Sequence, residues 1–312
     1  MEYKKVKPIF NYIGGKSWLR TELRKATEES LKNNDIDTYC EPFSGALGAF
    51  LGVYDVLIKY GVKNVIINDI NSHLISIYSN LQNNKQTLLE EIEKIEKDFL
   101  KTIPEETFLL HKTKDKIKIK ELLKEANNFY KKQRDTFNKS ILNKSPDAAS
   151  LIFLQSHCFN GVYRENSKGY YNTPFNWEAN KYKIEIMEKK LEELEEVFSY
   201  FNIQFLNKNY DEIEYNEKTL YYVDPPYLNE DSKIENKYNK NVFNIEDQKK
   251  LISLIKNKNF IYSNHYNSIL INELQFNKNI DIKQVARKNI ISSNNESRKN
   301  DKIEILASNR IK

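Results

Sequence analysis

The octapeptide LYYVDPPY, residues 220–227, joins a short apolar run to an acid, two prolines and a tyrosine. Proline cannot donate to a sheet ladder, so a strand that runs into this stretch has to end at the prolines. We therefore expect Asp224 and Tyr227 at the carboxyl end of a buried strand. In open α/β sheets, ligands bind at that edge.

Similar strand-length runs recur along the chain and end in turn or polar residues. They are DTYCEPF (37–43), NVIIND (64–69), IQFLN (203–207), FIYSNH (260–265) and IEILASN (303–309). Helical patterns lie between several of them, such as residues 180–201, where Ile184, Met187, Leu191, Leu194 and Phe198 share one face. Strands that alternate with helices predict an α/β sheet with crossover connections.

Residues 72–149 interrupt this alternation with Lys-rich helical sequence and no convincing strand, which predicts an inserted helical domain. The next stretch, residues 151–175, begins apolar and then has a polar turn at Asn166 to Gly169 between aromatic residues. Such a pattern is typical of a projecting β-hairpin.

The bulk composition excludes several classes of protein. No apolar run approaches the ~20 residues of a membrane span, and the N-terminus lacks the apolar core of a signal peptide, which predicts a soluble, cytoplasmic protein. Two cysteines and four scattered histidines predict neither a disulfide framework nor a metal site. The net charge of +5 suits a polyanionic partner but also many ordinary enzymes.

Two motifs before the helical insertion favour a nucleoside-bearing cofactor. In CEPFSGALGAF (40–50) a strand leads through glycines to a helix, which is a cradle of backbone amides. NVIIND then delivers Asp69 at the end of the next strand, where an acid accepts from ribose hydroxyls. FNYIGGK (10–16) adds a glycine turn before Lys16, but it lacks the spacing of a P-loop.

The acid and prolines of residues 224–227 suit attack by the exocyclic amine of a nucleobase. The lone pair of that amine is delocalised into the ring, so an enzyme has to offer acceptors to its two N–H groups. Asp224 and the carbonyl of Pro225 can accept them, and Tyr227 can stack on a base taken out of a duplex. A turn that caps a helix is the structural alternative.

The motifs, taken in their order along the chain, resemble those of the Dam-type (alpha-group) N6-adenine DNA methyltransferases. The resemblance covers most of the chain. The set is FNYIGGK, CEPFSGALGAF, IINDINSHLI, CFNGVYRENSKGYYNTPF, YVDPPY and SSNNESRKNDKIEILASN. The resemblance implies an α/β, Rossmann-like fold that binds S-adenosyl-L-methionine, with an inserted helical target-recognition domain and a β-hairpin. The catalytic domain would comprise residues 1–71 and 177–312, and the target-recognition domain residues 72–176.

Motif positions then assign residues by resemblance. The catalytic set is Asp224, Pro225, Pro226 and Tyr227. The cofactor-binding set is Tyr12, Gly14, Gly15, Lys16, Glu41, Phe43, Gly45, Asp69, Asn209, Tyr210 and Asp224. The DNA-binding set, on the hairpin, is Phe159, Asn160, Arg164, Asn166, Lys168 and Pro174.

Within these sets Phe159 and Asn160 would invade the base stack, and Arg164 would read a base, since its two donors suit guanine. Asn209-Tyr210 stands where many relatives carry Asp-Phe, although an Asn carbonyl also accepts from an amine. Tyr170 stands where relatives often carry an acid, so no recognition sequence is assigned.

The implied function is methylation of the 6-amino group of a flipped adenine in double-stranded DNA, with a cognate restriction endonuclease as a candidate partner and no metal. The alternatives are an RNA adenine or N4-cytosine methyltransferase, or a DNA-binding module with a degenerate pocket. Many N4-cytosine enzymes carry Ser in place of the Asp, and a duplex-invading hairpin disfavours RNA.

Overall fold

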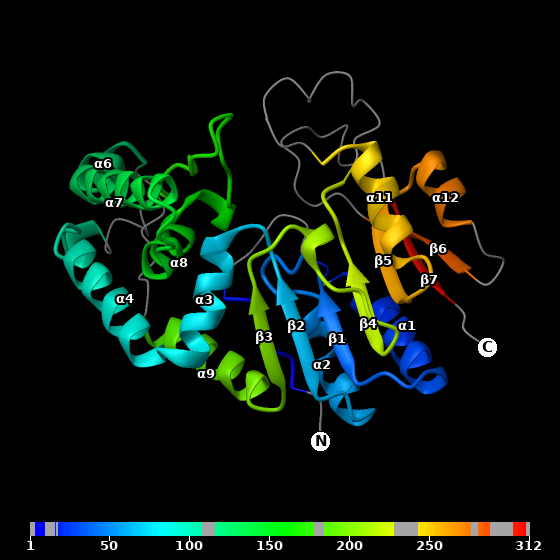
Figure 1. The fold of residues 1–312 in the computed structure, drawn as a ribbon. Coiled ribbons are helices and arrows are strands. Elements are labelled where there is room, and N and C mark those ends of the chain that lie inside the picture. Colours follow the sequence, from blue (N-terminus) through cyan, green and yellow to red (C-terminus); the bar gives the residue numbers. More distant parts are fainter. Residues whose placement is uncertain are drawn as a thin grey trace. The chain divides into compact units, whose positions relative to one another are not determined.

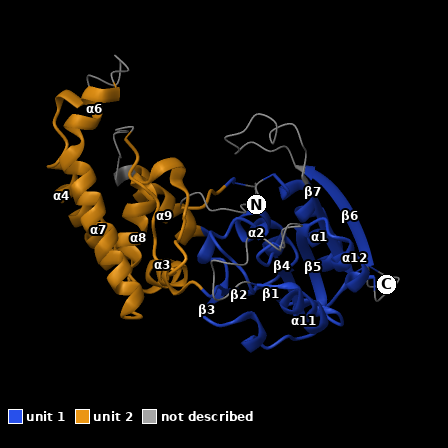
Figure 2. Cartoon of the chain, turned by 90° about the horizontal axis from the view of Figure 1, so that it is seen from above, with its two compact units in different colours: residues 1–5, 15–70, 197–312 blue, residues 6–14, 71–196 orange. Residues whose placement is uncertain are grey.

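The computed structural model describes residues 4–9, 16, 18–107, 116–177, 184–227, 243–275, 280–287 and 302–309. The chain forms two compact units (Figure 2). Unit 1 comprises Met1–Lys5, Gly15–Ile70 and Val197–Lys312, and unit 2 comprises Val6–Gly14 and Asn71–Glu196.

Unit 1 is built on a seven-stranded sheet with the order β3-β2-β1-β4-β5-β7-β6 (Figure 1). The strands are β1 (Thr38–Glu41), β2 (Asn64–Asn68), β3 (Asn202–Leu206), β4 (Thr219–Val223), β5 (Asn259–His265), β6 (Ile280–Arg287) and β7 (Lys302–Asn309). Strands β1 to β5 are parallel, whereas β7 runs antiparallel to both of its neighbours. The strand order reverses between β1 and β4, and such a switch point is where open α/β sheets bind ligands.

All six strands expected from the sequence are confirmed, but β6 was missed. Its sequence, IDIKQVAR, carries only a few apolar residues, and the strand pairs with β7 alone. An edge strand buries less apolar surface than a central one, so its composition gives a weaker signal. The central strand β4 is buried at all five positions.

Helices cover both faces of the sheet in unit 1 (Figure 2). Helices α1 (Arg20–Asn33) and α2 (Phe50–Lys59) pack together on one face, and α11 (Ile245–Ile255) lies on the other. The short helices η2 (Tyr210–Glu212) and α12 (Ser268–Leu274) complete the unit. Side chains of α11 and α12 form one apolar core with alternate residues of β4 and β5.

Unit 2 is mainly helical, as the sequence of residues 72–149 indicates. Its helices are α3 (Ser72–Asn83), α4 (Lys85–Leu100), α6 (Lys116–Leu122), α7 (Lys124–Leu142), α8 (Ala148–His157), η1 (Phe159–Gly161) and most of α9 (Ile184–Phe198). Its core contains Phe99, Phe137 and Phe153, all at most 1% exposed.

The division between the units differs from the boundary expected at residue 176. Helix α9 belongs largely to unit 2, because its Lys190 donates to the carbonyl of Ile9 and its Glu195 pairs with Lys85. Its predicted apolar face is confirmed at Met187, which is buried.

Among the residues described, none of the helices combines the length and the apolar character that crossing a membrane would need.

Candidate functional site

The carboxyl ends of β1 and β4 place Glu41 and Asp224 at the same edge of the sheet. Both oxygens of the Asp224 carboxylate are engaged. The hydroxyl of Ser263 donates to Oδ1 over 2.9 Å, and Lys16 Nζ lies 2.9 Å from Oδ2. The Asp224 side chain is 17% exposed and that of Lys16 only 3%. The strand end therefore carries a largely buried ion pair.

The residues that follow Asp224 differ in burial and in their contacts. Pro225 is buried, whereas Pro226 is exposed and its carbonyl accepts a 3.0 Å hydrogen bond from Gln248 Nε2. The hydroxyl of Tyr227 donates to Glu304 Oε2 over 3.1 Å.

The ring of Tyr227 has two further neighbours. Its centroid lies 4.3 Å from that of His265, and Lys16 Nζ lies 4.6 Å from it. The lysine thus combines a carboxylate contact with a cation–π contact.

Burial shifts the pKa values of the two acids at this edge of the sheet. It raises the pKa of Asp224, and the ion pair with Lys16 opposes that rise. Burial raises the pKa of Glu41 from 4.5 to about 8, although Tyr39 donates a 2.8 Å hydrogen bond to it. Glu41 therefore holds its proton at neutral pH, while Lys16 favours the ionised form of Asp224.

The turn between β1 and α2 is shaped as a cradle. Gly45 has a φ of 48°, which favours glycine, and its amide donates to Asp69 Oδ2 over 2.9 Å. Asn68 Nδ2 donates to the carbonyl of Pro42 over 2.9 Å and holds the other end of the turn. Between them the hydroxyl of Ser44 is buried without a hydrogen-bond partner in the described structure.

Aromatic rings gather beside this cradle. Phe43, Tyr210 and Phe243 have centroids 5.4 to 5.7 Å apart. Asn209 accepts from the amide of Tyr210 over 2.9 Å and caps η2. Ile70 follows Asp69 with 73% of its surface exposed.

Several predicted residues cannot be placed. Tyr12, Gly14 and Gly15 lie outside the described residues. Within the described ranges, no group of three or more histidine, cysteine, aspartate or glutamate side chains has the arrangement of a metal site. Cys40 and Cys158 are both buried and form no disulfide.

The expected hairpin is present in unit 2. Bridges join Cys158 to Phe175 at its base and Glu165 to Tyr171 near its tip. The tip itself closes through a 2.9 Å bond from the amide of Asn166 to the carbonyl of Tyr170.

The hairpin is anchored on α7. Tyr130 donates to the carbonyl of Thr173 over 3.0 Å, and the Asn138 side chain bonds both the amide and the carbonyl of Tyr171. These hydrogen bonds hold the exposed residues of the hairpin in place.

The predicted hairpin residues lie on its outer surface. Phe159 is 54% exposed, and Asn160 has a φ of 58°. Arg164 is exposed, and its Nε donates to Asn172 Oδ1 over 2.7 Å. Lys168 and Pro174 are also exposed, and the Pro174 carbonyl accepts from the Phe159 amide over 2.9 Å.

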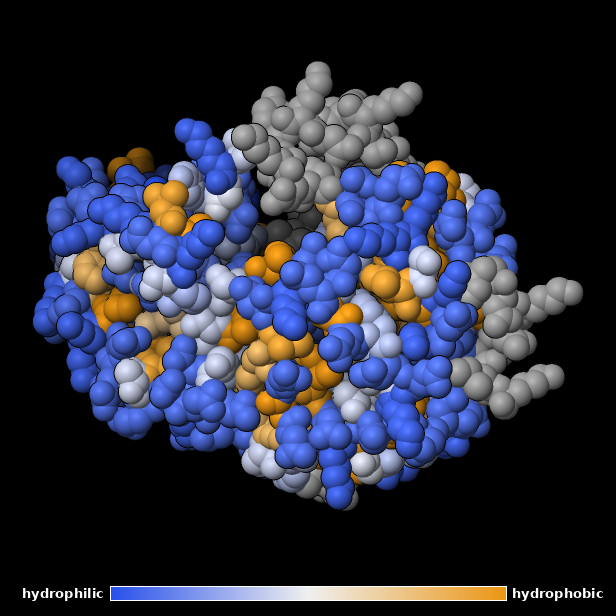
Figure 3. All heavy atoms as spheres, in the orientation of Figure 1, coloured by the Kyte–Doolittle hydropathy of each residue, from blue (hydrophilic) through white to orange (hydrophobic). Residues whose placement is uncertain are grey.

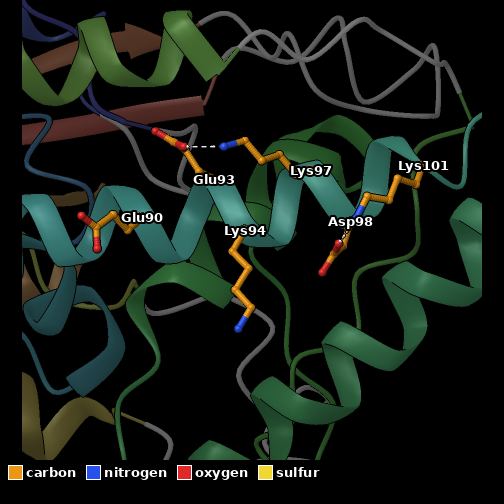
Figure 4. Close-up of a pocket in the computed structure, with 6 residues that line it drawn as sticks. All are labelled: Glu90, Glu93, Lys94, Lys97, Asp98 and Lys101. Carbon is orange, nitrogen blue, oxygen red and sulfur yellow. Dashed lines mark hydrogen bonds and ion pairs between the residues drawn. The ribbon is translucent and has the colours of Figure 1, made fainter.

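A depression on α4 is lined by charged side chains (Figure 4). Three acids and three lysines line it: Glu90, Glu93, Lys94, Lys97, Asp98 and Lys101. Glu93 pairs with Lys97 and Asp98 with Lys101 along the same helix. Such exposed intrahelical pairs are ordinary surface features.

Sequence reasoning missed the residues that support the site, namely Ser263, Gln248, Glu304 and Phe243. Ser263 had a detectable signal, because it lies near the polar end of the predicted strand 260–265. Glu304 and Gln248 had none, since their contacts depend on which strands and helices become neighbours.

A doubly wound sheet of this order, with an acid after β2 and Asp-Pro-Pro-Tyr after β4, defines a Rossmann-like methyltransferase. The family model for the D12 class of N6 adenine-specific DNA methyltransferases matches residues 12–301, and the chain belongs to this family. It is therefore an adenine-specific DNA methyltransferase, and the family implies S-adenosyl-L-methionine as the methyl donor.

Proteins that are similar to this chain are also named as methyltransferases. The type II methyltransferase M.MjaIII of Methanocaldococcus jannaschii is 31% identical over 315 residues, which cover 97% of this chain and 99% of that protein. M1.LlaDCHI of Lactococcus lactis is 24% identical, over 91% of this chain and 89% of its own length. The DNA N-6-adenine-methyltransferase of Escherichia phage P1 is 26% identical over 81% of this chain but only 29% of its own length.

Proposed function

We propose that the chain transfers the methyl group of S-adenosyl-L-methionine to the 6-amino group of an adenine turned out of double-stranded DNA, with Asp224 as the main acceptor for that amine. The observation that carries this assignment is the engaged Asp224 carboxylate at the switch point of the sheet, where Lys16 Nζ donates to Oδ2 over 2.9 Å. In this proposal an amine N–H of the target base takes the place of the ammonium at Oδ2.

The acceptor pair explains how a weak nucleophile becomes reactive. Asp224 accepts one N–H of the adenine amine and the carbonyl of Pro225 accepts the other, which localises the nitrogen lone pair for attack. The amine becomes acidic once it is methylated, and its proton leaves toward Asp224 or water. Tyr227 stacks on the flipped base, and positioning supplies much of the rate.

The cradle fits the methyl donor. The buried hydroxyl of Ser44 lacks a partner in the described structure, so a ligand atom at this turn would satisfy it. Glu41 and Lys16 would hold the methionine part, and Asp69 would accept from the ribose hydroxyls. When bound, S-adenosyl-L-methionine supplies an electrophilic methyl group on its sulfonium.

The aromatic cluster would hold the adenine of the donor. Phe43 and Tyr210 pack within 5.6 Å of one another and offer an apolar wall. Asn209 has its carbonyl occupied by the amide of Tyr210, so it would act by fixing η2 as well as by direct contact. Gly14, Gly15 and Tyr12 belong to the same proposal on motif grounds.

The hairpin would enter the DNA. Phe159 exposes half of its surface on an anchored scaffold, which suits a side chain that fills the space of a flipped base. Asn160 would lie next to it, and Arg164 would exchange its bond to Asn172 for a guanine edge. Asn166, Lys168 and Pro174 would contact the duplex along the same edge.

Exposed lysines of unit 2 would contact phosphates. Lys116, Lys120, Lys124, Lys131 and Lys139 project from α6 and α7 and are exposed. Hydrophilic residues cover most of the visible face of the helical unit in Figure 3. Such contacts would make DNA affinity fall as salt rises. A cognate restriction endonuclease stays a candidate partner in this proposal.

The test is transfer of a radioactive methyl group from S-adenosyl-L-methionine to duplex DNA, followed by digestion to nucleosides. Label in N6-methyldeoxyadenosine supports the proposal, and Asp224→Ala should abolish it while DNA binding persists. Label in RNA or in N4-methyldeoxycytidine would refute it, as would an active Asp224→Ala enzyme.

A further inference from the structure

Strand β5 ends in Ser-Asn-His, residues 263–265, called here the β5 terminus. It runs alongside residues 224–227, called here the acceptor segment, because the register pairs Val223 with Tyr262. The side chains of the β5 terminus take part in three sets of contacts. Each set ends on a different part of the acceptor segment.

The first set fixes one oxygen of Asp224. A carboxylate only accepts, so the 2.9 Å bond from Ser263 uses the single proton of that hydroxyl. Tyr222, whose hydroxyl lies 3.0 Å from Ser263 Oγ, must then be the donor of that second bond. These two hydrogen bonds tie Oδ1 to two buried strands, whereas Oδ2 pairs with Lys16.

The second set fixes the carbonyl of Pro226 through a relay of three buried side chains. Asn264 Nδ2 donates to the Tyr262 hydroxyl over 2.9 Å, and Tyr262 donates to Gln248 Oε1 over 2.7 Å. Gln248 Nε2 then donates to the Pro226 carbonyl over 3.0 Å. All three relay residues are fully buried, so an unmade bond in this chain leaves a costly buried polar atom.

The relay decides which proline carbonyl is available. Gln248 holds the Pro226 carbonyl on the side of α11, whereas the Pro225 carbonyl meets no donor in the described part of the chain. The direction of the relay is set, because a carbonyl oxygen cannot donate. The acceptor for the second amine N–H is thereby Pro225.

The third set fixes Tyr227. His265 packs against its ring, and Glu304, the register partner of His265 on β7, accepts from its hydroxyl. The Tyr227 side chain is thus held by β5 at its ring and by β7 at its hydroxyl.

We propose that the β5 terminus, Tyr262 and Gln248 are positioning residues, which hold Asp224 Oδ2 and the Pro225 carbonyl as the two acceptors of the target amine. This inference rests on the proposed function. The residues touch neither substrate nor cofactor, and act through the acceptor segment. A displacement of about 1 Å in a reacting group costs on the order of 10²-fold in rate.

The relay is tested by Tyr262→Phe, which removes the central hydroxyl and keeps the ring. Gln248→Met is a second variant of similar length. The matched control is Tyr54→Phe, since Tyr54 is 4% exposed and donates one 2.7 Å bond to the carbonyl of Lys4, outside the acceptor segment. The measurements are the single-turnover methylation rate, the Kd values for DNA and S-adenosyl-L-methionine, and the Tm.

The expected result is a rate reduced by on the order of 10²-fold in both relay variants, with both Kd values at the wild-type level. Tyr54→Phe should lose a comparable amount of Tm and keep its rate. A relay variant with the rate of the control overturns the inference, as does a rate that falls only with the folded fraction. A wild-type enzyme that methylates no adenine overturns the proposed function instead, and this inference with it.

Discussion

Replacing Lys16 by methionine should shift the acid limb of the methylation rate to higher pH. The variant keeps most of the apolar stem but removes the ammonium, which lies 2.9 Å from Asp224 Oδ2 in a site that is 3% and 17% exposed at its two side chains. Burial already raises the pKa of Asp224, and Lys16 is the largest opposing influence.

The direction follows from the ion pair. A positive charge beside a carboxyl favours its ionised form, so the loss of the Lys16 ammonium should raise the pKa of Asp224 further. The ionised fraction at neutral pH falls accordingly, because an acid with a higher pKa keeps its proton to higher pH.

The assay is the single-turnover methylation rate from acid to alkaline pH at saturating S-adenosyl-L-methionine and subsaturating DNA, which reports the enzyme before a target base reaches Asp224. Lys59→Met is the control, since Lys59 forms a 2.7 Å pair with Glu28 at the exposed surface. A Lys16→Met profile with the wild-type acid limb, merely lowered at every pH, would refute the electrostatic role and leave only cofactor binding for Lys16.

Three further changes test other parts of the account. Phe159→Ala should reduce the fluorescence signal of a flipped 2-aminopurine and leave the cofactor Kd unchanged, since the 54% exposed ring lies on the hairpin; an undiminished signal would argue against intrusion. Arg164→Ala should relax one position of the recognition sequence by ~1 to 3 kcal/mol, seen as a broadened methylation motif, and an unaltered motif would exclude base reading there. Glu41→Gln should flatten the pH dependence of stability: the folded pKa of about 8 exceeds the ordinary 4.5, so wild-type stability falls as pH rises between these values, and parallel Tm profiles for the two proteins would contradict this.

The sequence was sufficient for the central part of the fold. The apolar runs before Asp69 and Asp224 predicted strands β2 and β4, because a buried parallel strand has a strong apolar signal. The edge strand β6 was missed because only half of its residues are apolar and it pairs on one side only, which gives a weaker composition signal than a central strand.

The residues that support the site could not be predicted from the sequence, for a different reason. Gln248 and Pro226 are 22 residues apart, and Tyr227 and Glu304 are 77 apart. Their contacts exist only after α11 and β7 have taken their places beside β5. Local patterns give the type of an element, but the neighbours of a side chain depend on topology.

The sequence likewise predicted helix α9 but not the unit to which it belongs. Its amphipathic pattern predicted the helix, and Leu191 and Leu194 are buried as expected. The pattern did not indicate which core receives that face, and the contacts of Lys190 and Glu195 assign it to unit 2.

The most direct test of the central claim is to express the protein in a host that lacks adenine methylation and to map modified bases across the genome by single-molecule sequencing. We expect N6-methyladenine at one short motif, and Asp224→Ala should remove it. An unmodified genome in cells that contain folded protein able to bind S-adenosyl-L-methionine would contradict it.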